Sequence, residues 1–158
     1  MGTVVTQDEL MRHVAEAKSR GRRVVFTNGC YDLLHPGHIR LLEAARELGD
    51  VLVLALNSDR SVRGNKGAER PIIPENERAE ITAALAAVDY VVLFDEPTPR
   101  EIIERVLPNV LVKGSDWDVD EIVGREEVEG TGGRVVSIPL EPGYSTSFII
   151  ESILKIPS

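Results

Sequence analysis

The stretch that decides the fold is RRVVFTNGCYDLLHPGHIRLLEAARELGDVLVLAL, residues 22–56. It begins with a short apolar, β-branched run that ends before Gly29, and it closes on a second uniformly apolar run at residues 51–56. Both runs are typical of buried strands. Between them, apolar residues recur at helical spacing from Leu41 to Leu48. The stretch therefore predicts a strand, a loop, a helix and a second strand.

The same alternation continues on both sides of this unit. Thr6–Gly21 begins with an N-cap residue, has helical periodicity and ends in glycine, which predicts a helix. The segment SVRGNKGAERPIIP (residues 61–74) is polar, glycine-bearing and bounded by prolines, which predicts a mobile loop. Further helices are predicted at residues 75–87, from about 98, at 121–129 and from about 145, and further strands at 90–94, 109–114 and 134–140.

Most of the predicted strands are apolar throughout, as in a parallel sheet with helices on both faces. We therefore expect one doubly wound, Rossmann-like α/β domain over residues 1–158, built on a five-stranded parallel sheet. Residues 1–21 would form its N-terminal helix and residues 22–158 its core. The last helix would turn Ile149, Ile150, Ile153 and Leu154 inward.

Composition narrows the possible partners. The chain is 42% hydrophobic and 28% charged, with a formal net charge of −8, which argues against nucleic acid or an anionic membrane as a partner. The single cysteine, Cys30, excludes an internal disulfide framework and fits a reducing cytosol. No apolar run reaches about 18 residues, and no signal-peptide core begins the chain. We expect a cytoplasmic protein.

Four polar segments follow predicted strands: residues 28–38, 57–67, 113–117 and 141–147. The carboxyl ends of parallel strands meet at one edge of a sheet, and ligands of open α/β sheets bind there. These segments therefore predict a site at that edge.

His35 and His38 flank Pro36 and Gly37 within the first of these segments. A zinc site would need three or four ligands, and the remaining histidine, His13, lies in the N-terminal helix, so we predict no protein-bound metal. No glycine-flanked nucleophile elbow is present either.

A phosphate site explains the whole stretch. Gly29 permits close approach of the backbone, and the start of the helix after Pro36 offers free N–H groups and a partial positive charge. His35 and His38 can donate to phosphate oxygens from the loop and from the first turn. The alternative is that His35 caps a turn and His38 is a structural histidine.

GCYDLLHPGH (residues 29–38) resembles the G-x-F-D-x-x-H-x-G-H motif of the nucleotidyltransferase superfamily, which includes cytidylyltransferases and adenylyltransferases. Tyr31 stands where phenylalanine is usual. GYSTS (143–147) is similar to the superfamily's G-I-S-T-T, and KGSDW (113–117) looks like its base-pocket segment. The motifs occur in the expected order and span nearly the whole chain.

Within the superfamily, the chain is most similar to the adenylyltransferases that make ADP-heptose from heptose 1-phosphate and ATP. The stretch PLEPG (139–143) lacks the arginine that cytidylyltransferases often carry there. Glycerol-3-phosphate cytidylyltransferase and FMN adenylyltransferase remain alternative activities, and a nucleotide-binding regulator is the alternative that is not an enzyme. A dinucleotide-dependent oxidoreductase is disfavoured because the G-x-G-x-x-G spacing is missing.

The resemblance implies that a sugar phosphate oxygen attacks the α-phosphorus of ATP and expels pyrophosphate. It implies ATP and a sugar phosphate as substrates, Mg²⁺ bound through the nucleotide phosphates, a homodimer, and a separate heptose kinase as a working partner. Catalytic roles fall to His35, His38 and Lys66. Nucleotide contacts are expected from Thr27, Asn28, Gly29, Cys30, Tyr31, Asp32, His35, Gly37, His38, Lys66, Arg78, Lys113, Gly114, Asp116, Gly143, Tyr144, Ser145, Thr146 and Ser147, and substrate contacts from Lys66, Arg70 and Trp117.

Several of these residues also have a purely structural interpretation. Asp32 either orients a histidine or an amide, or simply forms a turn. Arg78 shares a helical stripe with apolar residues, so it either contacts phosphate or extends to the edge of the sheet. Trp117 packs either over a ligand or at the edge of the core. One hydroxyl suffices to cap the last helix, so the three at 145–147 favour a second phosphate-binding helix start.

Overall fold

Six parallel strands form the centre of the fold. In the computed structural model, which describes residues 1–114 and 118–158, they lie in the order β1-β4-β3-β2-β5-β6. The predicted parallel sheet is confirmed. Its strands are β1 (Thr3–Val4), β2 (Val24–Gly29), β3 (Val51–Asn57), β4 (Tyr90–Phe94), β5 (Val110–Gly114) and β6 (Arg134–Ile138).

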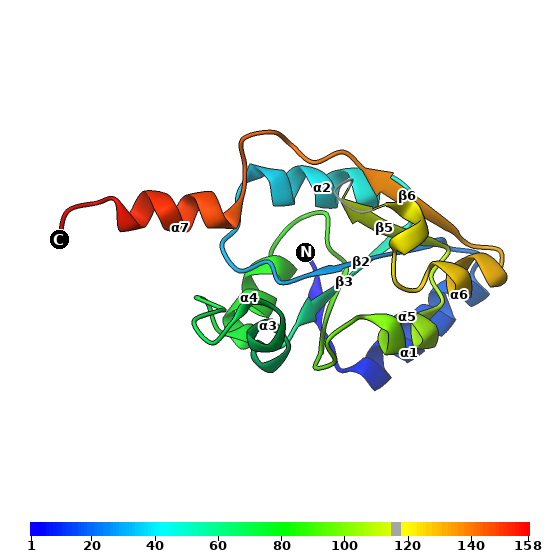
Figure 1. Cartoon of the computed structure of the whole chain (residues 1–158). Coiled ribbons are helices and arrows are strands. Elements are labelled where there is room, and N and C mark those ends of the chain that lie inside the picture. The colour runs from blue at the N-terminus through cyan, green and yellow to red at the C-terminus, as the bar shows by residue number, and fades with distance from the viewer. Residues whose placement is uncertain (115–117) are drawn as a thin grey trace.

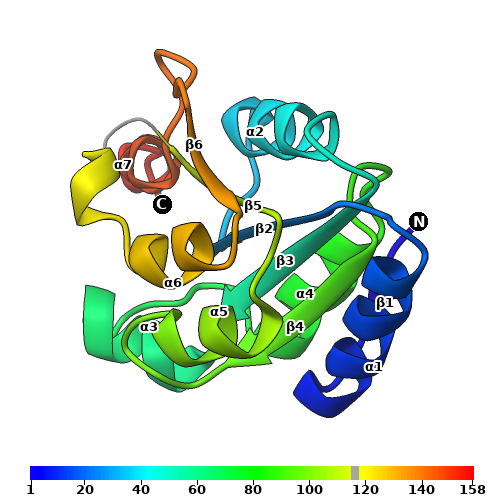
Figure 2. The ribbon, with the colours of Figure 1, turned by 90° about the vertical axis from the view of Figure 1, so that its right-hand side faces the viewer.

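Helices cover both faces of this sheet. One face packs against α1 (Gln7–Ser19), α5 (Arg100–Val106) and α6 (Arg125–Gly130), and the other against α2 (Pro36–Arg46) and α4 (Glu75–Ala83). Figure 2 shows α2 and the pair α5 and α6 on opposite sides of β2. The remaining elements are α3 (Asp59–Lys66), the 3₁₀ helix η1 (Val119–Glu121) and α7 (Thr146–Leu154).

The two faces divide the core into two apolar clusters. In β2, Phe26 packs into the cluster with α1 and α5, whereas its neighbour Val25 packs into the cluster with α2 and α4. Successive side chains of a strand point to opposite faces, so a strand covered on both sides must be apolar at every position. The uniform runs in the sequence reflect this double coverage.

The strands and helices differ from the sequence prediction at several places within the described residues. The sheet has six strands instead of five, because Thr3–Val4 pairs with the edge of β4, and two residues are too few to show a period. The weak helix predicted at 121–129 divides into η1 and α6. The segment 61–74 is not one loop, because α3 continues to Lys66.

α3 forms where the sequence predicted a loop, because its start is capped and one of its faces is anchored. The Ser58 hydroxyl accepts a hydrogen bond from the N–H of Ser61, and Val62 is fully buried. The helix ends at Gly67, whose φ of 104° favours glycine.

α7 projects away from the sheet, and the C-terminus lies at its far end (Figure 1). All nine of its residues are described, and none is buried. Ile153 and Leu154 are 55% and 78% exposed. The prediction that they face inward is therefore wrong, because their apolar spacing identified an apolar helix face without identifying what covers it. No helix in the described residues is long and apolar enough to cross a membrane.

Candidate active site

The carboxyl ends of β2, β3 and β5 open onto a cavity of about 490 Å³, which we call the strand-end cleft. A cavity of this size suits a small-molecule ligand. The polar segments that follow these strands meet there, at the edge that the topology predicts. The lining includes Asn28, Gly29 and Cys30 from β2 and its loop, Asn57 from β3, Lys66 from α3 and Lys113 from β5.

His35 and His38 lie together at the start of α2. Their rings stack with centroids 3.8 Å apart. The backbone N–H of His35 donates to Nδ1 of His38 over 3.3 Å. Because Nδ1 accepts this bond, neutral His38 carries its proton on Nε2. His38 can therefore donate to a ligand through Nε2–H.

The surroundings keep His38 uncharged. Burial lowers the pKa of His38 to about 4, and the nearby charges of His35 and Lys66 act in the same direction. Burial also lowers the pKa of His35. Nδ1 of His35 is buried and has no hydrogen-bond partner among the described residues, an arrangement that costs free energy. The pair is thus a neutral donor set with an unsatisfied polar atom.

The glycines of the motif make room for aromatic rings. A Cβ at position 37 would lie 2.9 Å from Cε1 and Nδ1 of His35, closer than a real Cβ atom approaches. A Cβ at position 29 would lie 2.8 Å from Cε2 of Tyr31. The Tyr31 ring lies in turn 4.9 Å from the ring of His38. Gly29 and Gly37 therefore permit the packing that holds the two histidines.

The start of α7 lies beside the start of α2 (Figure 1). The Thr146 hydroxyl donates to the carbonyl of Leu33 over 3.1 Å, and the Tyr144 ring stacks 6.1 Å from the ring of His35. An ion pair between Arg40 and Glu141 joins the same two segments. These contacts bring residues 143–147 to the histidine pair, although they are more than 100 residues away in the sequence.

The three hydroxyls at the start of α7 differ in their contacts. Ser145 Oγ caps the helix by accepting from the N–H of Phe148, and Thr146 bonds Leu33. Ser147 lines a second cavity of about 530 Å³, which we call the α7 cleft. Gly143 precedes them with a φ of 85°, a left-handed conformation that favours glycine.

Lys66 borders both clefts. It is the last residue of α3 and lines the strand-end cleft on one side and the α7 cleft on the other. Arg70 also lines the α7 cleft, together with Ser147 and Ile150 of α7. The α7 cleft thus has two cations in its lining, and one of them, Lys66, is shared with the strand-end cleft.

Four residues that we expected to contact nucleotide lie behind the site. Thr27 is 1% exposed, and its hydroxyl donates to the Val112 carbonyl, which ties β2 to β5. Tyr31 is buried in the core cluster beneath His38. The side chains of Asp32 and Arg78 are almost completely buried, and both bind backbone groups of the protein. The side chains of these four are held by the protein itself and line neither the strand-end cleft nor the α7 cleft. Their contact with nucleotide stays a prediction.

The base-pocket segment is only partly described. Lys113 lines the strand-end cleft, and Gly114 is buried at the end of β5. Asp116 and Trp117 lie outside the described residues.

Several residues that line the strand-end cleft escaped the sequence analysis. Asn57 ends β3, and its amide donates to the Ser61 hydroxyl, while Asn65 of α3 donates to the Pro97 carbonyl. Both asparagines fall in the polar segment 57–67, which the sequence places at the site. The turn at 97–99 and the residues 121–123 showed no comparable signal, because they carry few groups suited to chemistry.

The expected Mg²⁺ can be tested against the available donor groups. Among the described residues, no three His, Cys, Asp or Glu side chains lie close enough together to hold a metal ion. Mg²⁺ prefers oxygen ligands, whereas the site presents imidazoles and a lysine. The residues described therefore do not form a dedicated magnesium site.

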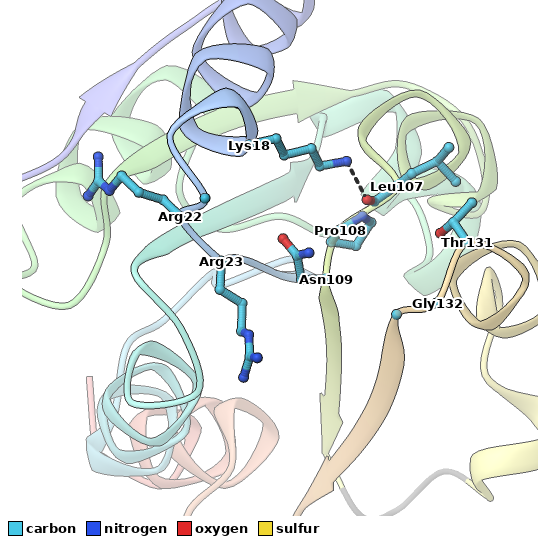
Figure 3. Close-up of a pocket in the computed structure, with 10 residues that line it drawn as sticks. Lys18, Arg22, Arg23, Leu107, Pro108, Asn109, Thr131 and Gly132 are labelled. Carbon is cyan, nitrogen blue, oxygen red and sulfur yellow. Dashed lines mark hydrogen bonds between the residues drawn. The ribbon is translucent and has the colours of Figure 1, made fainter.

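A cavity of about 460 Å³ at the opposite, amino edge of the sheet is less suited to ligand binding. The Lys18 ammonium there donates to the carbonyls of Val106 and Leu107, which end α5. Figure 3 shows the Arg22 and Arg23 side chains pointing away from each other. In this cavity, Lys18 is thus used to bind the end of α5, and the two arginines do not point toward a common ligand position.

A parallel α/β sheet with a His-x-x-His pair at a helix start, next to a second helix start and a lysine, defines the class of nucleotidyltransferases. The family model described as "Cytidylyltransferase-like" matches residues 26–152. The chain belongs to the cytidylyltransferase-like family.

Among curated proteins, the chain is 57% identical over 148 residues to the "Bifunctional protein HldE" of Citrifermentans bemidjiense and 56% identical to that of Geobacter sulfurreducens. Each match covers 94% of this chain and 30% of the relative, so the chain spans less than a third of these relatives. A solved lipopolysaccharide core biosynthesis protein of Thermoplasma volcanium is 30% identical, with a TM-score of 0.64 over 77% of this chain and 98% of that one.

The fold is also shared with a more distant enzyme. Pantothenate synthetase of Thermus thermophilus is 21% identical, with a TM-score of 0.57 over 88% of this chain and 62% of that one. This likeness shows the fold alone.

Proposed function

We propose that this chain transfers AMP from ATP to heptose 1-phosphate, giving ADP-heptose and pyrophosphate. The observation that carries the proposal is the stacked, neutral pair His35 and His38 at the start of α2, with Lys66 between two clefts beside it. Such a group of donors and cations suits a reaction in which charge moves between phosphates.

The chemistry needs positioning more than a nucleophilic side chain. An oxygen of the sugar phosphate forms a bond to the α-phosphorus, while the bond from that phosphorus to the pyrophosphate oxygen breaks and its electron pair leaves with pyrophosphate. The attacking phosphate is already ionised at pH 7, so no strong base is required. His38 donates from Nε2, His35 from its ring, and Lys66 offsets the developing negative charge.

The two clefts provide separate places for the two substrates. We assign the nucleotide to the strand-end cleft, because its walls come from the carboxyl ends of three strands. We assign the sugar phosphate to the α7 cleft, which is lined by Lys66, Arg70 and Ser147. Lys66 borders both, so the reacting phosphates would meet beside it. Mg²⁺ would accompany the triphosphate, bound through its oxygens and water.

The sugar and the nucleotide are inferred from similarity. The motifs resemble those of the ADP-heptose branch, the curated relatives are named HldE, and one solved relative is a lipopolysaccharide core biosynthesis protein. A heptose kinase would supply the sugar phosphate, which agrees with the word bifunctional in the name of the relatives.

We also propose that the protein acts as a homodimer. The exposed apolar side chains of α7, among them Phe148, Ile153 and Leu154, support self-association, because isolated apolar surface in water is unfavourable. Sedimentation equilibrium tests this directly, and a monomer at micromolar concentration would refute it.

The experiment that tests the function is pyrophosphate release with a panel of substrates. ATP, CTP, GTP and UTP are each paired with heptose 1-phosphate, glycerol 3-phosphate and FMN in the presence of Mg²⁺. We expect the highest kcat/KM for ATP with heptose 1-phosphate. Preference for CTP with glycerol 3-phosphate, or for ATP with FMN, would move the chain to another branch, and binding without turnover would make it a regulator.

A further inference from the structure

Asp32 and Arg78 are the two charged residues that are fully buried among residues 1–114 and 118–158. Asp32 lies in the loop between β2 and α2 and is 2% exposed, and Arg78 lies on α4 and is 1% exposed. Burying a charge is costly unless partners compensate for the lost water. Their partners therefore indicate what the two residues do.

Asp32 forms hydrogen bonds with the segment that follows α3. Its Oδ1 accepts from the N–H of Ile73 over 2.8 Å, and its Oδ2 accepts from the N–H of Ile72 over 2.8 Å and from Nε of Arg70 over 3.0 Å. Burial raises the pKa of Asp32, but these hydrogen bonds and the charge of Arg70 outweigh it and hold the pKa below its usual value. Asp32 is therefore an anion at neutral pH.

Arg78 binds the same segment through a backbone carbonyl. Its Nε donates to the carbonyl of Ile73 over 2.9 Å, and its Nη1 donates to the carbonyls of Cys30 and Asn57 over 2.7 and 2.9 Å. Its Nη2 pairs with Asp59 over 2.9 Å. One guanidinium thus joins the ends of β2 and β3 to Ile73.

Asp32 and Arg78 both bind the backbone of Ile73: Asp32 binds its N–H and Arg78 binds its carbonyl. The chain from Arg70 to Ile73 is consequently fixed to the two central strands. Arg70 is held at Nε, while its two Nη nitrogens have no partner among the described residues. Arg70 lines the α7 cleft, with its side chain 16% exposed.

We propose that Asp32 and Arg78 are positioning residues that hold Arg70 at the α7 cleft, so that its free Nη nitrogens bind the phosphate of the acceptor substrate. This inference rests on the proposed function. An arginine held at Nε presents its other edge as a two-nitrogen fork, the geometry that binds phosphate oxygens best. Holding the side chain beforehand reduces the entropy that substrate binding must overcome.

A merely structural role predicts something different. Breaking a buried ion pair destabilises a protein wherever it lies, because the remaining charge is left without a partner. The structure offers a control with the same kinds of partner in Asp89, whose side chain is 35% exposed. Its Oδ2 accepts from the N–H of Leu52 over 2.8 Å and from Nε of Arg46 over 3.1 Å. Asp89 directly precedes β4, at the edge of the sheet opposite the site.

The test compares Asp32→Asn with Asp89→Asn. Both variants should lose thermal stability, but only Asp32→Asn should raise the KM for heptose 1-phosphate, by about tenfold, with the KM for ATP changed less than about threefold. In an Arg70→Ala background, Asp32→Asn should have little further effect on the KM for the sugar, because its effect passes through Arg70. Arg78→Lys, which keeps the charge but loses the fork, should give the same selective rise.

Three results would overturn the proposal: equal changes in both KM values, an unchanged KM with loss of stability alone, or a full effect of Asp32→Asn that persists without Arg70. If Asp32→Asn does not fold, Arg70→Lys provides the same KM comparison. A measurement without substrate distinguishes this inference from the proposed function. Amide hydrogen exchange at Ile72 and Ile73 should accelerate in Asp32→Asn, because the carboxylate that binds both N–H groups is lost. Faster exchange in a protein that releases no pyrophosphate would refute the proposed function but leave the positioning role of Asp32 intact. Unchanged exchange would refute that positioning role.

Discussion

The backbone N–H of His35 donates to Nδ1 of His38, and the two imidazole rings stack with their centroids 3.8 Å apart. The two histidines therefore act as one unit: the loop residue sets the tautomer of the helix residue, and the helix residue supports the ring of the loop residue. Because the pair is neutral at pH 7, the proposed function requires it to stabilise phosphate charge by hydrogen bonding rather than by carrying charge of its own.

The neutrality of the pair predicts an unusual titration. In ¹H–¹⁵N NMR spectra, His38 should titrate with a midpoint near 4, since burial and the charges of His35 and Lys66 lower its pKa. Lys66→Ala should raise this midpoint by removing a positive charge, whereas Lys155→Ala at the far end of α7 should leave it unchanged. A midpoint near 6.5 in the native protein would contradict the burial of the ring.

The same shift links folding stability to pH. Unfolded His38 has a pKa of about 6.5, so between this pH and about 4 the unfolded chain binds more protons at this residue than the folded chain does. The contribution of His38 to stability is present above about pH 6.5 and is lost as the pH falls towards 4. Denaturant titrations of the native protein and of His38→Gln should therefore converge across this range. A constant difference would exclude the linkage.

Gly37→Ala should impair catalysis without unfolding the protein. The new Cβ would displace the His35 ring, and an error of about 1 Å in a positioned group can cost about 100-fold in rate. The helix itself should tolerate alanine, which has a higher helix propensity than glycine. We expect kcat to fall by about tenfold or more with an unchanged melting temperature. Gly130→Ala is the control, because nothing lies within 4 Å of its Cβ position, and it should retain full activity.

Lys66→Ala should lower kcat by about 100-fold while changing ATP affinity less. Lys66 borders both clefts, so its charge is best used when the two phosphates meet in the transition state. Lys66→Arg should restore activity only in part, because a planar fork replaces a compact charge. Single-turnover rates and equilibrium ATP binding on the same variant separate these effects. Weaker binding with an unchanged chemical step would make Lys66 a ground-state anchor.

Thr146→Val should separate α7 from the site. None of the residues of α7 is buried, so its position depends on a few contacts, of which the bond from Thr146 to the Leu33 carbonyl is the most direct. We expect about a tenfold loss of kcat/KM with little change in the free energy of unfolding. Ser152→Ala removes a hydroxyl that bonds only within the same helix, and it should have no effect. Equal losses in both variants would show that helix stability, rather than this contact, matters.

The sequence was most informative where periodicity and chemistry coincide. The run from Val24 to Gly29 shows no alternation, which indicates a strand covered on both faces, and the polar residues after it mark the edge that carries the site. The arrangement of His35, Pro36, Gly37 and His38 places two imidazoles in and before the first turn of a helix. Local geometry alone leads to this result, so it could be predicted.

What the sequence could not show depends on contacts between distant segments. Asp32 and Arg78 are charged residues near a motif, and only the fold reveals that they meet at Ile73 instead of facing the cleft. The apolar residues of α7 were predicted to be buried but are exposed. The sequence pattern of an apolar helix face is the same whether or not the chain itself covers that face.

The central claim is that the pair His35 and His38 supports attack on the α-phosphorus of ATP, and the most direct measurement is the fate of a ³²P label at that position. Native protein incubated with α-labelled ATP, Mg²⁺ and heptose 1-phosphate should transfer the label to a sugar nucleotide and release unlabelled pyrophosphate. His38→Ala should form this product about 100-fold more slowly while remaining folded. Label that stays in ATP or appears in free AMP, or a His38→Ala variant that transfers it at the native rate, would contradict the account.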